Sequence, residues 1–145
     1  MRFLIAWIGK TKQPAAAAWT EEYLRRVRRF ARVASCEIDA RQGDAGLLRL
    51  LQAQGGRRLV LLDPAGRQLD SPEFASFLAR AFARDGREML LAIGGADGFG
   101  PEARAAAEGA LSLSAMTYSH ELARVMLAEQ LYRALALLHG HPYPR

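Results

Sequence analysis

Cysteine is nearly absent from this sequence of 145 residues, and long apolar runs are absent altogether. A single cysteine, Cys36, excludes an intrachain disulfide and with it a disulfide-stabilised scaffold. No stretch reaches the roughly 18 apolar residues of a transmembrane helix. The apolar run at 3–8 is too short for a signal peptide and lacks a clear cleavage site. We therefore expect a cytoplasmic protein in which Cys36 is a small core residue rather than a nucleophile.

The common nucleotide-binding motifs are also missing. No G-x-x-x-x-G-K-[ST] occurs, which excludes a P-loop ATPase. The glycine-rich segment 94–100 lacks the G-x-G-x-x-G spacing of a dinucleotide-binding domain and does not follow the first strand. The three histidines, His120, His139 and His141, have no cysteine or suitably spaced carboxylate to complete a metal site. We therefore expect no metal.

The net charge of +5 is unevenly distributed along the chain. Residues 1–68 contain 13 Lys and Arg against 6 Asp and Glu, a net charge of +7, whereas residues 69–145 contain 7 against 9, a net charge of −2. This asymmetry favours a polyanion such as nucleic acid bound by the basic half over a scattered, solvated arginine surface. Much of the charge surrounds the first expected helix, in Arg25, Arg26, Arg28, Arg29 and Arg32. Its expected apolar stripe is Trp19, Tyr23, Val27 and Phe30.

Helical and strand patterns alternate along the chain. Strands are expected at 2–8, 33–38, 58–62, 89–93 and 111–114, with a loop at 63–67. Helices are expected to begin at Pro14, at a cap Asp44, at a cap Ser71, at Pro101 and at a cap Ser119. This order predicts one α/β domain over residues 1–145, with a mainly parallel sheet and helices on both faces.

The last expected helix, from Ser119 to about Leu138, is apolar on nearly every side. The residues concerned are Leu122, Val125, Met126, Leu127, Leu131, Leu135 and Leu138. Such a helix needs cover on more than one face, and in so small a protein a second subunit is the expected cover. The pattern therefore predicts a homodimer.

Two loops follow expected strands, 63–67 and 94–100. Ligands of an open parallel sheet bind beyond the carboxyl ends of its strands. Four glycines within 94–100 permit close approach of a ligand to the backbone. We therefore expect a cofactor cradle made of main-chain groups, with an ordinary glycine-rich connection as the alternative.

At these loops the sequence resembles a known family. The segments are LLDPAGR at 61–67, LAIGGADG at 91–98, LSLSAMT at 111–117, RVMLAEQLYRA at 124–134 and HPY at 141–143. Gly9-Lys10 and YLRR at 23–26 add to them. Together they resemble successive motifs of the ribosomal RNA large subunit methyltransferase H family of the SPOUT class, over nearly the whole chain.

The resemblance implies a SPOUT fold with a C-terminal trefoil knot and a homodimer that binds S-adenosyl-L-methionine without a metal. It also implies methylation of N3 of a pseudouridine in 23S rRNA within the assembled ribosome. The matching cofactor-contacting residues are Leu62, Gly94, Leu113, Ser114, Ala115, Met116, Thr117 and Tyr118. The positions that match the family's substrate side are His120, Arg124, Tyr143 and Arg145.

By residue type, His120 is the candidate base that removes the N3 proton, although a packing role in the first turn of its helix is the alternative. Arg124 or Arg145 is a candidate for stabilising charge on the uracil or for holding phosphate. Two other functions stay open. One is a SPOUT methyltransferase that acts on another RNA such as tRNA, and the other is a non-catalytic ribosome-binding module.

Overall fold

The computed structural model describes residues 1–143, apart from the side chain of Gln54. Within these residues, the strands are β1 (Arg2–Ile8), β2 (Arg32–Ile38), β3 (Arg58–Gln68), β4 (Met89–Ile93) and β5 (Gly109–Ser112). They form one sheet in the order β2-β1-β4-β3-β5, and every pairing is parallel. The α/β fold class expected from the sequence is confirmed.

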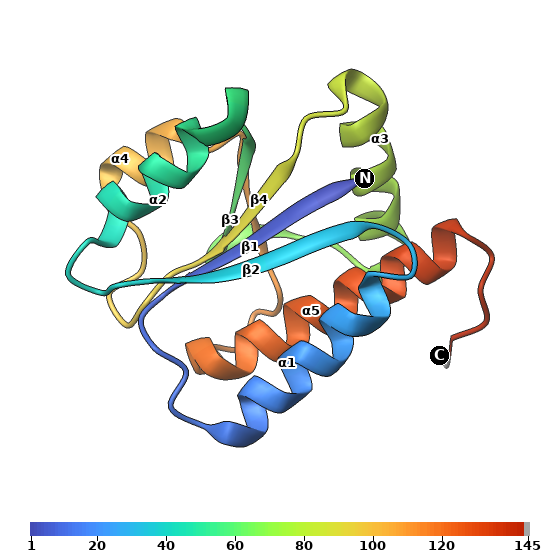
Figure 1. Cartoon of the computed structure of the whole chain (residues 1–145), viewed down its shortest axis with the longest axis horizontal. Helices are drawn as coiled ribbons and strands as arrows, with labels where there is room; N and C mark the ends of the chain where they lie inside the picture. The colour runs from blue at the N-terminus through green and yellow to red at the C-terminus, as the bar shows by residue number, and fades with distance from the viewer. Residues whose placement is uncertain (144–145) are drawn as a thin grey trace.

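Helices cover both faces of this sheet (Figure 1). They are α1 (Pro14–Val27), α2 (Gly43–Gln52), α3 (Ser71–Asp85), α4 (Pro101–Ala106) and α5 (His120–Leu138), with a short 3₁₀ turn, η1 (Ala53–Gly55), after α2. α1, α3 and α5 lie on one face, and α2 and α4 lie on the other. Each connection therefore carries the chain over a face before the next parallel strand.

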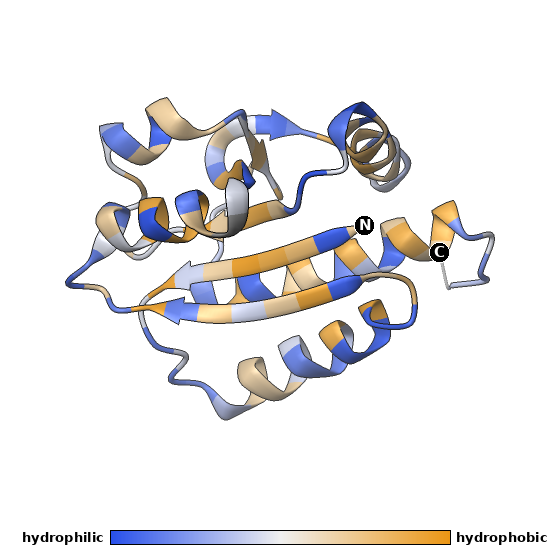
Figure 2. Cartoon of the chain, turned by 45° about the horizontal axis from the view of Figure 1, so that its top comes forward, coloured by the Kyte–Doolittle hydropathy of each residue, from blue (hydrophilic) through white to orange (hydrophobic). Residues whose placement is uncertain are grey.

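Strand β1 contributes side chains to the hydrophobic cores on both faces of the sheet. Phe3, Ile5 and Trp7 pack with α1, α3 and α5, whereas the alternate residues Leu4 and Ile8 pack with α2 and α4. Successive side chains of a strand point to opposite faces, so a strand covered on both sides must be apolar throughout. Figure 2 shows this as a nearly continuous hydrophobic strand next to the N-terminus.

Strand β3 extends further than expected. Residues 63–67 were expected to be a loop, but β3 continues to Gln68 after a register shift, in which Leu62 and Arg67 both pair with Leu111. The intervening residues bulge outward. Gly66 lies against β5, where an added Cβ would be 2.7 Å from the backbone nitrogen of Leu111. The turn-forming residues of 63–67 therefore make a bulge within a strand. Strand β5 ends at Ser112, two residues before its predicted end.

Two predicted helix caps are wrong. Helix α2 has Gln42 at its N-cap, and the Asp44 carboxylate instead accepts hydrogen bonds from the backbone N–H groups of Gly100 (3.2 Å) and Ala103 (3.0 Å) at the start of α4. Helix α3 is capped by Asp70 rather than Ser71, because Asp70 forms a reciprocal capping box with Glu73. The third cap, Ser119, is confirmed, since its hydroxyl accepts from the N–H of Leu122 at 3.2 Å.

The apolar faces of α1 and α5 differ from their predictions. In α1 the buried residues are Thr20, Leu24 and Val27, and Trp19 is 57% exposed. Helix α5 packs against α1 and α3, which bury Leu127, Leu131 and Leu135 within one chain. Leu122 remains 47% exposed and Leu138 39% exposed. One chain thus covers most of α5, and the homodimer stays a prediction that rests on the remaining exposed residues.

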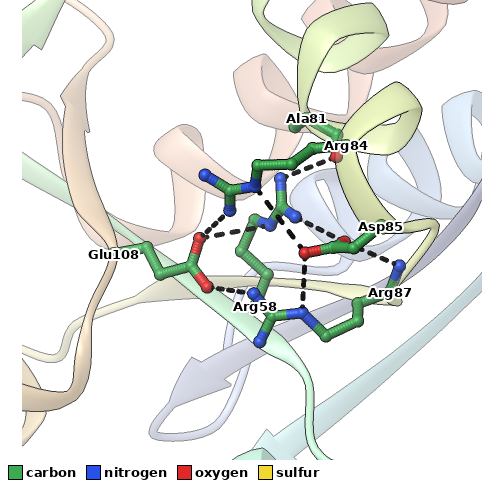
Figure 3. Close-up of polar contacts among 6 residues, drawn as sticks. All are labelled: Arg58, Ala81, Arg84, Asp85, Arg87 and Glu108. Atoms are coloured by element: carbon green, nitrogen blue, oxygen red, sulfur yellow. Dashed lines mark hydrogen bonds and ion pairs between the residues drawn. The ribbon is translucent and has the colours of Figure 1, made fainter.

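A charged cluster joins the start of β3 to the end of α3 and the start of β5 (Figure 3). Arg58 is buried, and its guanidinium donates to Asp85 Oδ1 (2.6 Å) and lies 3.2 Å from Glu108 Oε2. Arg84 and Arg87 also contact these two carboxylates. The cluster sits at the amino ends of the strands, the edge of the sheet opposite to the loops that follow β3 and β4.

Candidate functional site

A cavity of about 280 Å³ opens at the carboxyl ends of β3 and β4. Its walls come from the end of β3 and the loop after β4, and from the segment between β5 and α5 together with the first turn of α5. The lining residues are Leu62, Asp63, Pro64, Ile93, Gly94, Gly95, Ala96, Gly98, Phe99, Ser112, Leu113, Ser114, Met116, Thr117, Tyr118, Ser119, His120 and Ala123. Segments far apart in the sequence therefore meet where a parallel sheet binds its ligands.

Most of the residues assigned to a cofactor by resemblance line this cavity. They are Leu62, Gly94, Leu113, Ser114, Met116, Thr117 and Tyr118, and His120 lines it as well. Ala115 is exposed and lies outside the lining. Among residues 1–143, the lining contains no lysine or arginine, and its acidic residue is Asp63.

The glycine-rich loop 94–100 is folded tightly on itself. The N–H of Gly98 donates to the carbonyl of Gly95 at 3.0 Å, and Gly98 has a φ of 68°. An added Cβ on Gly94 would lie 3.1 Å from the Cα of Gly98. Glycine at position 94 thus lets the loop pack this closely on itself, whereas a side chain there would require Gly98 to shift.

Helix α4 and the distant Asp44 hold this loop in place. Arg104 donates to the carbonyl of Phe99 (3.3 Å) and to Asp63 Oδ2 (2.7 Å), so it joins the glycine-rich loop to the end of β3. Asp63 is 8% exposed and also accepts from the N–H of Ala65 at 2.9 Å. Sequence reasoning missed Asp44 and Arg104, because nothing in their local sequence indicates partners about 40 to 60 positions away.

Two serines shape the segment that leads into α5. The hydroxyl of Ser112 donates to the carbonyl of Ser114 at 2.8 Å, and Ser114 Oγ accepts from the N–H of Met116 at 2.9 Å. Short side chains that bond nearby backbone stabilise such turns. The segment consequently forms one wall of the cavity, and Met116 within it is 74% exposed.

Arg124 lies beneath the site rather than in its wall. It is 1% exposed, donates to the carbonyl of Gly9 (3.3 Å) and to Thr11 Oγ1, and stacks 5.0 Å from the ring centre of Trp7. Burial lowers the pKa of Arg124 below its ordinary value. These contacts connect α5 to the loop between β1 and α1, residues 9–13, which we call the β1–α1 loop.

Tyr143 lies far from His120 in the same chain. Its ring packs edge-on against Tyr132 at 4.7 Å, and the Arg133 guanidinium lies 4.6 Å from its centre. Burial is the main cause that raises the pKa of Tyr143. Tyr132 follows His120 by 12 positions on α5, which corresponds to about 18 Å along the helix axis. Arg145 lies outside the described residues.

A second cavity of about 360 Å³ adjoins the first. Gly95, Ala96 and His120 line both, so these residues form the shared wall. The rest of its lining is Ile8, Gly9, Lys10, Lys12, Asp39 and Ala40. His120 is therefore accessible from two compartments.

Other candidate chemistry is sparse in residues 1–143. No group of three or more His, Cys, Asp or Glu side chains there has an arrangement suited to a metal ion. His139 packs against Phe30, with ring centres 4.9 Å apart. Cys36 is a free thiol, half buried against the α2 and α4 side of the core, and burial raises its pKa. None of the helices in these residues has the length and hydrophobicity to span a bilayer.

Comparisons with known proteins point in one direction. A family model described as a predicted SPOUT methyltransferase matches residues 1–144. The ribosomal RNA large subunit methyltransferase H of Solibacter usitatus is 41% identical over 145 residues and covers 100% of both chains. The protein of that name from Koribacter versatilis is 41% identical and covers 99% of this chain and 97% of its own.

Among solved structures, a methyltransferase of Legionella pneumophila in complex with the cofactor SAM is 12% identical. It covers 90% of this chain and 65% of its own, with a TM-score of 0.47.

Proposed function

Since the chain belongs to the SPOUT methyltransferases, and among them to the ribosomal RNA large subunit methyltransferase H family, we propose that it methylates N3 of a pseudouridine in 23S rRNA. The methyl donor is S-adenosyl-L-methionine, and the substrate is the assembled ribosome, which places the protein in the cytoplasm. One observation carries the proposal: the first cavity lies at the carboxyl ends of β3 and β4 and is lined by seven of the eight residues assigned to the cofactor.

The chemistry of this cavity suits such a donor. A ligand with phosphates would favour cationic side chains, and the described residues of the lining include none. The acidic residue of the lining, Asp63, is paired with Arg104. Leu62, Ile93 and Leu113 offer apolar surface to an adenine ring, and Gly94, Ser114 and the residues 116–118 bring hydrogen-bonding groups to the same cavity. When bound there, S-adenosyl-L-methionine supplies a methyl group on sulfur for in-line transfer.

His120 is the proposed base for the N3 proton. It lies at the wall shared by the two cavities, where a cofactor in the first and a base in the second would meet. A neutral imidazole accepts a proton near neutral pH, and a positioned base contributes about 10²–10⁴-fold to a rate. Arg124 is held in the interior, so we assign it to positioning rather than to contact with the reacting atoms.

The direct test is incubation with labelled S-adenosyl-L-methionine and one of four acceptors: whole ribosomes, large subunits, free 23S rRNA or tRNA. Nucleoside mass spectrometry then identifies the product. Methylated pseudouridine from whole ribosomes is expected. Label only in tRNA would favour the alternative acceptor. Ribosome binding with no transfer to any RNA would favour a non-catalytic module.

A further inference from the structure

We propose that the second cavity binds a backbone phosphate of the acceptor RNA, through Lys10 and Lys12. This inference rests on the proposed function, because it names the part of the chain that holds the acceptor beside the cofactor. In this proposal Arg124 and Glu121 position the β1–α1 loop.

The location of the second cavity suits an acceptor strand. It shares Gly95, Ala96 and His120 with the first cavity, so a nucleotide bound in it would have its base next to His120. The first cavity has a volume of about 280 Å³ and the second a volume of about 360 Å³, and the three shared residues separate them. A two-substrate transfer needs such adjoining sites, because the reacting atoms must be held close together.

The two cavities differ in charge, as expected for a cationic sulfonium cofactor in the first and an anionic RNA phosphate in the second. Within the part of the chain that the structure describes, the first has no cationic residue in its lining, whereas the second has Lys10 and Lys12. These are the only lysines among the 20 Lys and Arg residues of the sequence. An ammonium group is a compact point charge that binds phosphate without a fixed orientation.

One carboxylate, Asp39, also lines the second cavity, and it is already paired. Its partner is Arg41, at 2.8 Å. Hydrogen bonds from Arg41 are the main cause that lowers the pKa of Asp39 to about 2, so it stays ionised and balanced by that arginine. Lys10 and Lys12 outnumber Asp39 among the charged residues of the lining, so the net charge of the lining is positive.

Three side chains, those of Glu37, Glu121 and Arg124, form hydrogen bonds that hold the β1–α1 loop. Glu121 Oε1 accepts from the N–H groups of Lys12 (2.5 Å) and Gln13 (2.9 Å), and Glu37 Oε2 accepts from that of Thr11 (2.9 Å). The buried Arg124 donates to the carbonyl of Gly9 and to the hydroxyl of Thr11. The hydrogen bonds from Gln13 and Lys12 also lower the pKa of Glu121. An exposed loop with this many contacts is pre-organised, and a pre-organised site loses less entropy on binding.

The test compares a Lys10→Ala/Lys12→Ala variant with a charge-matched control, Arg49→Ala/Arg80→Ala, whose arginines are exposed on α2 and α3. The lysine variant should raise KM for ribosomes roughly tenfold at moderate salt and lower the salt slope of log affinity by roughly 0.7–0.9 per lysine. Its kcat and its Kd for S-adenosyl-L-methionine should stay within about twofold of wild type. Lys10→Arg/Lys12→Arg should have a KM for ribosomes close to that of wild type, because it keeps both positive charges.

The positioning role has its own variant, Thr11→Val, which removes one partner of Arg124 without changing charge. It should raise KM with little change in kcat, and its Tm should fall by only a few degrees, because one donor of the buried Arg124 loses its acceptor. The proposal would be overturned by a lysine variant that keeps the KM and salt slope of wild type. It would also be overturned by a control variant whose KM rises as much as that of the lysine variant.

Failure of the proposed function looks different. In that case the wild-type protein transfers no methyl group to any RNA. Ribosome pelleting of the same variants then tests the phosphate site alone: retention of wild-type binding by the lysine variant refutes it, and a loss absent from the control supports it.

Discussion

His120 is the residue on which the proposed chemistry depends most directly. His120→Asn keeps a polar side chain of similar size but removes the proton acceptor. We expect kcat to fall by about 10²-fold or more, with KM for ribosomes and Kd for the cofactor little changed. Single-turnover methylation measures this. The matched control is His141→Asn, whose ring lies against Phe30 away from both cavities. Unchanged turnover in His120→Asn would assign His120 to packing.

Gly94 sets the width of the glycine-rich loop. In Gly94→Val the Cβ would lie 3.1 Å from the Cα of Gly98 and 3.3 Å from its carbonyl oxygen, so the loop must shift. Overpacking of this kind costs about 1–3 kcal/mol, or roughly 5- to 150-fold in cofactor affinity if the strain falls on the binding loop. Calorimetry measures the affinity.

Gly109→Val is the control for Gly94→Val, because no atom lies within 4 Å of a Cβ added at Gly109. Equal cofactor affinity in the two valine variants would contradict a specific role for the loop at Gly94.

Single residues were also where sequence reasoning most often failed. Ser71 and Asp70 are both good caps, and the capping box with Glu73 decides in favour of Asp70. Trp19 fits an apolar stripe as well as Thr20 does, but the rotation of α1 against α5 buries Thr20. Such choices depend on tertiary packing, which local pattern does not contain.

At the scale of elements, Asp44 links α2 to the start of α4 and hence to the glycine-rich loop. Asp44→Ala leaves the N–H groups of Gly100 and Ala103 without this acceptor. Loss of such a cap costs about 1 kcal/mol, so we expect Tm to fall by about 3–5 °C and cofactor Kd to rise roughly fivefold. Asp97→Ala, an exposed change in the same loop, is the control. Unaltered Kd in Asp44→Ala would show that loop and helix are uncoupled.

The charged cluster of Figure 3 predicts a pH dependence of stability. The pKa of Asp85 is lowered from 3.8 to about 2, first by the backbone N–H of Arg87 and then by its side chain. A lowered folded-state pKa contributes stability that is present above the unfolded value and is lost as pH falls from about 4 towards 2. Asp85→Asn should therefore flatten the fall in Tm over that range. Asp97→Asn should keep the wild-type slope, and an equal slope in Asp85→Asn would contradict the assignment.

The elements themselves were largely predictable. Continuous apolar runs such as 59–62 and 89–93 predict strands buried on both faces, and the strands lie there. The continuation of β3 beyond Leu62 was not predictable, because Asp63-Pro64-Ala65-Gly66 has the composition of a turn and only pairing with β5 extends it. The basic face of α1 was also overestimated. Arg25 and Arg26 pair with Glu22 there, and Arg28 with Glu21.

At the scale of the whole molecule, the parallel sheet brings the loops after β1, β3 and β4 to one edge, with the first turn of α5 beside them. The location of the site was therefore predictable from strand order and loop composition. The separation into two cavities of different charge was not, since it depends on Arg124, Glu121 and Glu37, which hold the β1–α1 loop from distant positions. The trefoil knot remains a prediction.

A homodimer is the remaining prediction, and the structure sharpens it. Leu131 is buried within one chain, so Leu131→Glu would unfold the protein, whereas Leu122 and Trp19 are exposed. Sedimentation at micromolar concentration should give a dimer, and Leu122→Glu should yield a folded monomer. A wild-type monomer under those conditions would refute the prediction.

Mixed dimers test whether the two chains share a site. Tyr143 packs against Tyr132, which lies about 18 Å from His120 along the axis of α5, so a site that uses both His120 and Tyr143 takes Tyr143 from the partner subunit. His120→Asn and Tyr143→Phe homodimers should then both be impaired. Co-expressed at equal levels, they should recover about a quarter of wild-type activity, because half of randomly formed dimers are mixed and each mixed dimer has one intact site. Recovery would be absent if Tyr143 served its own chain, since no site would then hold both residues. Full activity of the Tyr143→Phe homodimer would show that the Tyr143 hydroxyl is not needed.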